Sequence, residues 1–270
     1  MLRFREYVKA ESLEEAYEKN QKKSARVIGG MLWLKMQNRT IQTAIDLSGL
    51  GLDTIEETEE EFRIGCMVTL RQLELSESLN AFTDGAVASC VKPIVGVQFR
   101  NLATVGGSIF GRFGFSDVLT LFLALDSYLQ LYRGGVISMA EFAAMEPDRD
   151  ILVRVIVKKT PGRVVCLSHR NTKTDFPVLT CAVRLAEDGR NLAVFAATPA
   201  RAKTYPVSEE WLQKFTGADE EKKKVMAAEF VSQVPTGSNI RAGAGYRSHL
   251  AAVLFRRGLT ELMEKGGSRS

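Results

Sequence analysis

The spacing of apolar residues divides the chain into three segments, and the first has the pattern of a βαβ unit. Residues 12–17 combine a capping-box signature with apolar positions at helical spacing. Short runs rich in β-branched residues follow at 25–28 and 40–47, and each is closed by a glycine-containing turn. This order predicts α/β structure from residue 1 to about residue 55.

The second segment follows an acidic run, residues 56–61, and surrounds a glycine-rich stretch. Thr69 and Gln72 form a second capping-box pattern, which predicts the start of a helix. The glycine-rich stretch extends from residue 96 to residue 117 and contains the pair Gly106-Gly107. The predicted elements are strands at 62–67, 127–132 and 151–157 and helical stretches at 79–91 and 118–125.

The third segment changes to a β meander followed by helices, which is typical of a separate α+β domain. Pro161-Gly162 is the predicted boundary, and Asp188-Gly189 predicts a tight turn between two strands. The predicted elements are strands at 163–168, 178–185 and 192–196 and helices within 220–233 and at 246–264. The order of elements therefore predicts a second domain from about residue 160.

Composition and charge argue against several classes of protein. The 270 residues are 45% hydrophobic, which is enough for a sizeable core. The net charge of +4 is scattered along the chain, so nucleic-acid binding is not expected. The longest apolar run, residues 118–125, is too short to span a bilayer, and the first residues contain no apolar signal-peptide core. We therefore expect neither a nucleic-acid partner nor a membrane partner.

Cysteine and histidine usage argues against a metal centre. The four cysteines stand singly and are expected to be buried or free thiols in a reducing cytoplasm; they are Cys66, Cys90, Cys166 and Cys181. The only two histidines are His169 and His249, so neither a His-based metal site nor a hydrolase triad is expected. We predict a cytoplasmic protein whose own residues bind no metal.

Two short stretches of similar sequence, residues 27–32 and 104–109, each contain a pair of glycines directly after β-branched residues. Glycine allows a bound group to approach the main chain closely, and exposed N–H groups in such turns form anion sites. Two such loops that face each other would hold a diphosphate. The simpler alternative is that each pair only forms a turn. Neither stretch is a G-x-G-x-x-G or P-loop motif, so a Rossmann or P-loop site is disfavoured.

The same residues resemble the flavoprotein subunits of the molybdenum hydroxylases, the xanthine dehydrogenase and carbon monoxide dehydrogenase type. Residues 27–34 are similar to the first FAD loop of that family, and residues 100–108 with Ser116-Asp117 are similar to the second. The order of the weaker matches also agrees along nearly the whole chain; these matches are residues 64–69, 118–126 and 150–152 and the group Arg241, Ala244, Tyr246 and Arg247.

The resemblance implies a fold and a cofactor. The expected fold is α+β: a two-part FAD-binding domain of the vanillyl-alcohol-oxidase (PCMH) type over residues 1–160, with subdomains of about 1–57 and 58–160. A small domain with a three-stranded sheet and helices is expected over residues 161–265. FAD is the expected cofactor, and its diphosphate is expected between the two glycine loops. The implied contact residues are Val27, Ile28, Gly29, Gly30, Met31, Leu32, Ala103, Thr104, Gly106, Gly107, Ser108, Ser116, Asp117, Ile151 and Leu152.

The resemblance also implies an activity. Electrons pass from a molybdopterin subunit through an iron–sulfur subunit to the flavin, which reduces NAD or another acceptor, so the chain is expected to be an oxidoreductase subunit. Two alternatives remain open: a stand-alone flavin oxidoreductase of the same fold, and a non-catalytic assembly protein without FAD.

Three further features have simpler interpretations. Arg170 is expected at a solvated strand end, with a position near the flavin or a partner as the alternative. Trp33 is expected either in the core or stacked near the cofactor. The acidic run at 56–61 is expected to be a solvated loop, and Cys66 and Cys90 are expected in the core.

Overall fold

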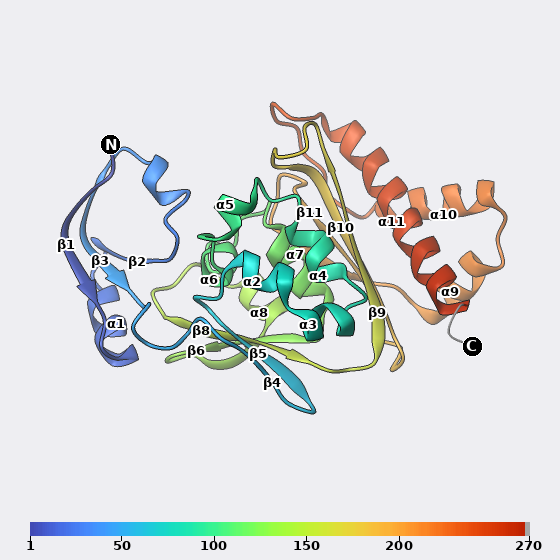
Figure 1. Ribbon diagram of the computed structural model, residues 1–270. Helices are drawn as coiled ribbons and strands as arrows, with labels where there is room; N and C mark the ends of the chain where they lie inside the picture. The colour runs from blue at the N-terminus through green and yellow to red at the C-terminus, as the bar shows by residue number, and fades with distance from the viewer. Residues whose placement is uncertain (268–270) are drawn as a thin grey trace.

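The first part of the chain is a three-stranded parallel sheet with one helix, as seen in the computed structural model, which describes residues 1–267 (Figure 1). The strand order is β1-β3-β2. The elements are β1 (Arg3–Lys9), α1 (Leu13–Asn20), β2 (Ala25–Ile28), the 3-10 helix η1 (Leu34–Met36) and β3 (Thr40–Asp46). The βαβ prediction is confirmed by β1, α1 and β2, although the sequence pattern indicates no strand at β1 itself. Its mostly exposed, charged residues hide the alternation that identifies a half-buried strand.

The second part is a five-stranded antiparallel sheet covered by short helices, with strand order β4-β5-β8-β6-β7 (Figure 1). Its strands are β4 (Ile55–Glu57), β5 (Glu61–Gly65), β6 (Ser127–Leu131), β7 (Gly135–Ser138) and β8 (Leu152–Lys158). Its helices are α2 (Leu70–Leu75), α3 (Glu77–Phe82), α4 (Ala86–Val91), α5 (Val97–Arg100), α6 (Val105–Ile109), α7 (Asp117–Ala124) and α8 (Met139–Ala144).

Two sequence-based expectations for this part are corrected. The helical stretch predicted at 79–91 is divided into α3 and α4, because Asp84 and Gly85 have φ angles of +49° and +78°, which end a right-handed helix. The acidic run, expected as a solvated loop, is exposed at residues 56–60, but its two ends are strand residues of the β4–β5 hairpin. Glu61 is buried within it and accepts hydrogen bonds from the side chains of Arg63 and Lys158.

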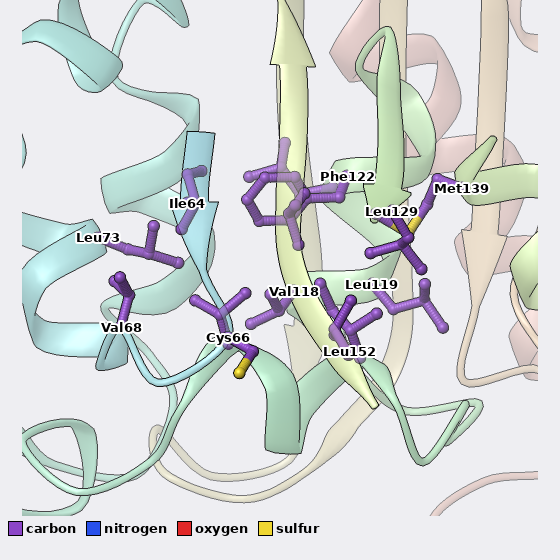
Figure 2. Close-up of a cluster of buried hydrophobic side chains, with 14 of the residues drawn as sticks. Ile64, Cys66, Val68, Leu73, Val118, Leu119, Phe122, Leu129, Met139 and Leu152 are labelled. Carbon is purple, nitrogen blue, oxygen red and sulfur yellow. The ribbon is translucent and has the colours of Figure 1, made fainter. Parts of the chain in front are cut away.

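Apolar side chains from strands and helices that are far apart in the sequence pack together in one core in this second part of the chain (Figure 2). Ile64 of β5 and Leu73 of α2 lie on one side, and Phe122 of α7 and Leu129 of β6 lie on the other. Each such side chain contributes about 1.5 to 3 kcal/mol when it is removed from water. The same core includes Leu152 at the start of β8 and Ile151 directly before it, so it anchors both of these predicted site residues.

The third part is a four-stranded antiparallel sheet with three helices, one strand more than predicted. The additional strand, β12, is short and pairs only with β11 at the edge of the sheet. The Asp188-Gly189 turn is confirmed between β10 and β11, and Gly189 has φ +79°. The elements are β9 (Gly162–Arg170), β10 (Pro177–Ala186), β11 (Leu192–Ala196), β12 (Lys203–Pro206), α9 (Glu209–Thr216), α10 (Glu220–Val231) and α11 (Ala244–Gly267).

This last sheet is buried on both faces. Ala182 on β10 packs with the core that contains α4 and α7, whereas its neighbour Val183 packs with the core that contains α10 and α11. Figure 1 shows the sheet between the central helices and the C-terminal helices. The end of β9 is therefore held against the start of α7, where predicted site residues lie. Within residues 1–267, no helix is both long and apolar enough to cross a membrane.

Candidate functional site

One cavity of about 740 Å³ lies where the three parts of the chain meet. The end of β2, the residues around α6, the start of α7 and the residues that begin β8 all line it. It brings together every residue that the resemblance implies as a cofactor contact: Val27, Ile28, Gly29, Gly30, Met31, Leu32, Ala103, Thr104, Gly106, Gly107, Ser108, Ser116, Asp117, Ile151 and Leu152. Segments separated by more than a hundred positions in the sequence thus share one wall.

The first glycine pair begins a loop with unpaired main-chain donors. Residues 29–33 leave β2 along the cavity wall, and Met31 has a left-handed conformation with φ +57°. Among the described residues, no hydrogen-bond acceptor is bound by the N–H groups of residues 29–33. Consecutive free N–H groups around a left-handed residue form a concave anion site. The site depends on main-chain atoms, so the apolar side chains of Met31 and Leu32 do not remove it.

The two glycine loops are in direct contact. A Cβ atom on Gly30 would lie 1.8 Å from the carbonyl oxygen of Leu102, and one on Gly29 would lie 2.5 Å from Oγ1 of Thr104. Glycine is therefore required at both positions so that the first loop can pack against the second. This contact gives the cavity two main-chain walls, as the diphosphate hypothesis requires.

The second glycine pair differs from the expected open turn, because it lies in the first turn of α6. Thr104 caps this helix: its Oγ1 accepts a hydrogen bond from the N–H of Gly107 at 3.1 Å. The hydroxyl of Ser108 donates to the carbonyl oxygen of Thr104 at 2.9 Å. The Thr104 hydroxyl can therefore still donate a hydrogen bond to a ligand, whereas the Ser108 hydroxyl can still accept one.

Asp117 begins α7 and is buried at the cavity wall, where polar partners surround its carboxylate. Its Oδ2 accepts from Nη2 of Arg170 at 2.5 Å, and its Oδ1 accepts from the hydroxyl of Thr180 at 2.9 Å. Burial raises the pKa of the Asp117 carboxyl above its ordinary value, and the charge of Arg170 opposes that rise. Asp117 therefore connects the helix at the cavity to the C-terminal sheet.

The expectation of a solvated Arg170 is wrong. Its side chain is only 8% exposed, and it lines the cavity beside Asp117. The sheet to which β9 belongs packs against α7, so the end of this strand is covered. The sequence carries no local signal for this burial, since an arginine at a strand end is usually solvated.

Aromatic side chains from three distant segments form one wall of the cavity. Trp33 stacks on Phe176, with ring centroids 5.0 Å apart, and contacts Phe99 at 5.5 Å. Phe115 meets the other side of this group, with its ring 4.6 Å from that of Phe176. Trp33 is 43% exposed, so it belongs to the cavity wall and not to the core. Such a wall suits a flat ring system.

The remaining walls are apolar at one place and charged at another. Ile151 and Leu152 are buried beside Cys66, and burial raises the pKa of the Cys66 thiol to about 12. The prediction that Cys66 and Cys90 lie in the core is confirmed.

Charged side chains line another part of the cavity, where Arg26 and Arg149 lie. The pKa of Arg26 is lowered, mainly by burial and also by the positive charge of Arg149. Asp148 and Asp150 line the same cavity, so the charges at this end of the site are mixed.

These residues fit a flavin dinucleotide. The cavity volume lies within the range of about 300 to 1,000 Å³ that is usual for ligand sites. The free N–H groups of residues 29–33 match a diphosphate, and the aromatic wall matches a tricyclic ring. When bound, FAD supplies the redox chemistry, and the chain binds and orients it.

Comparison with known proteins agrees with this geometry. The family described as the FAD binding domain in molybdopterin dehydrogenase matches residues 2–159, which is more than half of the chain. The chain therefore belongs to this family of FAD-binding domains, and FAD is its cofactor. A curated relative, the uncharacterized protein YgfM of Escherichia coli strain K12, is 25% identical over 213 residues, which cover 77% of this chain and 80% of the relative.

Solved structures share the whole fold. Quinoline 2-oxidoreductase from Pseudomonas putida 86 has a chain with a TM-score of 0.80 and 18% identity, covering 98% of this chain and 96% of that one. Carbon monoxide dehydrogenase from Hydrogenophaga pseudoflava, in a form that lacks the Mo-pyranopterin moiety of its cofactor, has a chain with a TM-score of 0.81 and 19% identity, covering 97% and 98%. The predicted fold class is thereby confirmed.

Proposed function

We propose that this chain is the FAD-carrying electron-transfer subunit of a molybdenum hydroxylase complex. In this proposal an iron–sulfur subunit delivers electrons that a molybdopterin subunit has taken from the substrate. The flavin then passes them to NAD or another acceptor, as in xanthine dehydrogenase. The family assignment supports a flavin subunit of this class, and the names of the two structural relatives are those of oxidoreductases.

The observation that carries the proposal is the contact between the two glycine loops. Gly30 packs against the carbonyl group of Leu102, so the unpaired N–H groups of residues 29–33 lie beside the residues around α6. We propose that these main-chain groups bind the diphosphate, and that the other residues predicted from the sequence bind the rest of FAD.

Gly107→Leu tests this placement. A Cβ atom on Gly107 would meet only Oγ1 of Thr104, at 3.1 Å, so the folded chain has room for a side chain that projects toward the ligand. We expect the isolated protein to bind FAD with visible flavin absorbance, and the variant to bind at least about 100-fold more weakly, because losing a diphosphate contact removes about 3 kcal/mol or more.

Gly245→Leu is the matched control. Gly245 lies in the first turn of α11, outside the cavity, and a Cβ atom there would meet nothing within 4 Å. This variant should bind FAD like the unmodified chain. Equal FAD affinity in the Gly107 variant and the control would refute the proposed position of the diphosphate.

The electron-transfer part of the proposal has a separate test. Affinity purification of the chain from its native host should recover iron and molybdenum, measured by mass spectrometry of the elements, together with FAD. Recovery of FAD without either metal, with oxidation of a small substrate by the chain alone, would favour the stand-alone flavin oxidoreductase. Recovery of partner subunits without FAD would favour the assembly protein.

A further inference from the structure

Arg170 carries one N–H group that the fold leaves without a partner. Its Nη2 donates to Asp117 at 2.5 Å, and its Nη1 donates to the main-chain oxygen of Asp175 at 2.6 Å. Its Nε atom is buried and has no hydrogen-bond partner within the described part of the chain. A buried donor on a charged group is rarely left unpaired, because it has lost its contacts with water.

Among the described residues, one nitrogen atom of each of two other arginines is also buried without a hydrogen-bond partner, but these two side chains do not line the cavity. Nη2 of Arg112 lies 3.8 Å from a carboxylate oxygen of Asp148, and that guanidinium covers the ring of Phe142 at 3.7 Å. Arg241 lies over the ring of Phe176, at 4.8 Å from its centroid. Of the three arginines with an unpaired buried nitrogen within residues 1–267, Arg170 alone lines the cavity. Arg170, the residue that carries this unpaired donor, therefore belongs to the wall of the ligand site.

The neighbours of Arg170 identify the part of the ligand that it meets. Arg170 contacts Asp175, and the next residue, Phe176, joins Trp33 and Phe115 in the aromatic wall. The tricyclic ring is the larger of the two flat ring systems of FAD, and, unlike adenine, it carries carbonyl oxygens as well as ring nitrogens that accept hydrogen bonds. The adenosine diphosphate part has its own donors in the N–H groups of residues 29–33.

We propose that Arg170 is a cofactor-contact residue that donates its Nε–H to an acceptor on the flavin half of FAD. Asp117 and Thr180 are positioning residues: the Asp117 carboxylate accepts a hydrogen bond from the guanidinium, and the Thr180 hydroxyl donates to the other oxygen of that carboxylate. The inference rests on the proposed function, because it takes FAD as the ligand. It assigns to the C-terminal sheet a direct role in recognising the flavin.

The comparison of FAD with ADP tests this assignment, because ADP contains the diphosphate but no flavin half. Arg170→Met should bind FAD about 10- to 100-fold more weakly, the range expected for the loss of one hydrogen bond from a charged donor. Its affinity for ADP should stay unchanged. Isothermal titration calorimetry gives both constants, and circular dichroism verifies that each variant is folded.

Arg184→Met is the matched control, since Arg184 is also buried, lies on β10 of the same sheet and does not line the cavity. It should leave both affinities unchanged. Arg170→Met removes the partner of a buried carboxylate, so the double variant Asp117→Asn/Arg170→Met provides a second measurement without an unpaired charge. It should show the same selective loss of FAD. Asp117→Asn alone should shift the ratio of FAD to ADP affinity in the same direction by a smaller factor.

Three results would overturn the assignment. The first is an unchanged FAD affinity in both Arg170 variants. The second is an equal loss of FAD and ADP affinity, which would indicate a contact with the diphosphate half or a purely structural role. The third is an equal effect of Arg184→Met. If the unmodified chain binds ADP but not FAD, the proposed function itself fails, and the role of Arg170 fails with it.

Discussion

Adjacent glycines in α6 offer a sharp test of how the second loop is built. The same substitution, glycine to alanine, should have opposite effects at Gly106 and Gly107. Alanine favours a helix over glycine by up to about 1 kcal/mol. At Gly107 the new Cβ atom meets only the capping hydroxyl of Thr104, at 3.1 Å; this contact is tight, but it involves a single side-chain atom that can shift by a few tenths of an ångström. We therefore expect Gly107→Ala to stabilise the chain by about 0.5 kcal/mol.

At Gly106 the new atom would lie 2.8 Å from the carbonyl oxygen of Cys66 and 3.0 Å from its Cβ atom. That carbonyl group also accepts the N–H of Gly106 at 2.8 Å, so the two segments cannot separate without losing a hydrogen bond. Forcing a methyl group into such a contact costs about 1 to 3 kcal/mol. The expected difference in unfolding free energy between the two variants is thus about 2 kcal/mol.

Urea unfolding followed by circular dichroism measures this difference on the chain without FAD, so the result does not depend on the proposed function. The slopes of the two transitions should agree, so that the midpoints compare stability directly. Equal midpoints for Gly106→Ala and Gly107→Ala would refute the close packing of α6 against Cys66. A less stable Gly107 variant would refute the open space beside that residue.

Two further predictions concern titratable groups. Hydrogen bonds from Lys158 and Arg63 lower the pKa of Glu61 below its ordinary 4.5, so its ionised form stabilises the fold fully above that pH and loses this effect as the pH falls through the lowered pKa. Glu61→Gln should therefore be less stable than the unmodified chain at pH 7, with a difference that shrinks in acid; a gap that is constant down to pH 2 would contradict this. Because the pKa of Cys66 is about 12, its thiol should resist alkylation at pH 8 until urea unfolds the chain, and rapid labelling of the native protein, located by mass spectrometry, would contradict its burial.

The first loop shows why the ligand site survives apolar side chains in its sequence. Met31 and Leu32 offer no polar atoms, yet the N–H groups of residues 29–33 are unpaired on the cavity wall. The left-handed conformation of Met31 sets the direction of the chain at this point. Gly29 and Gly30 permit the loop to touch its counterpart. The main chain, more than the side chains, therefore defines this site.

Local patterns in the sequence predict most of the helices and strands, and they predict the two glycine loops of the site. Capping residues such as Thr69, apolar spacing and the Asp188-Gly189 turn act over a few neighbouring residues, so they can be recognised without tertiary structure. The two glycine pairs belong to the same class of signal. Their identification as FAD loops came from resemblance, and composition alone leads only to a general phosphate site.

Tertiary contacts decided the rest, because they join residues that are far apart in the chain. β1 and β12 are recognisable only through their partners in a sheet, since none of their own residues is fully buried. Arg170 has an ordinary strand-end sequence, and its burial arises because the C-terminal sheet packs against α7 and pairs it with Asp117. The aromatic wall likewise combines Trp33 with Phe176, whose separation in sequence hides their contact. Burial and pairing depend on the position of the surrounding elements, and no local pattern encodes that position.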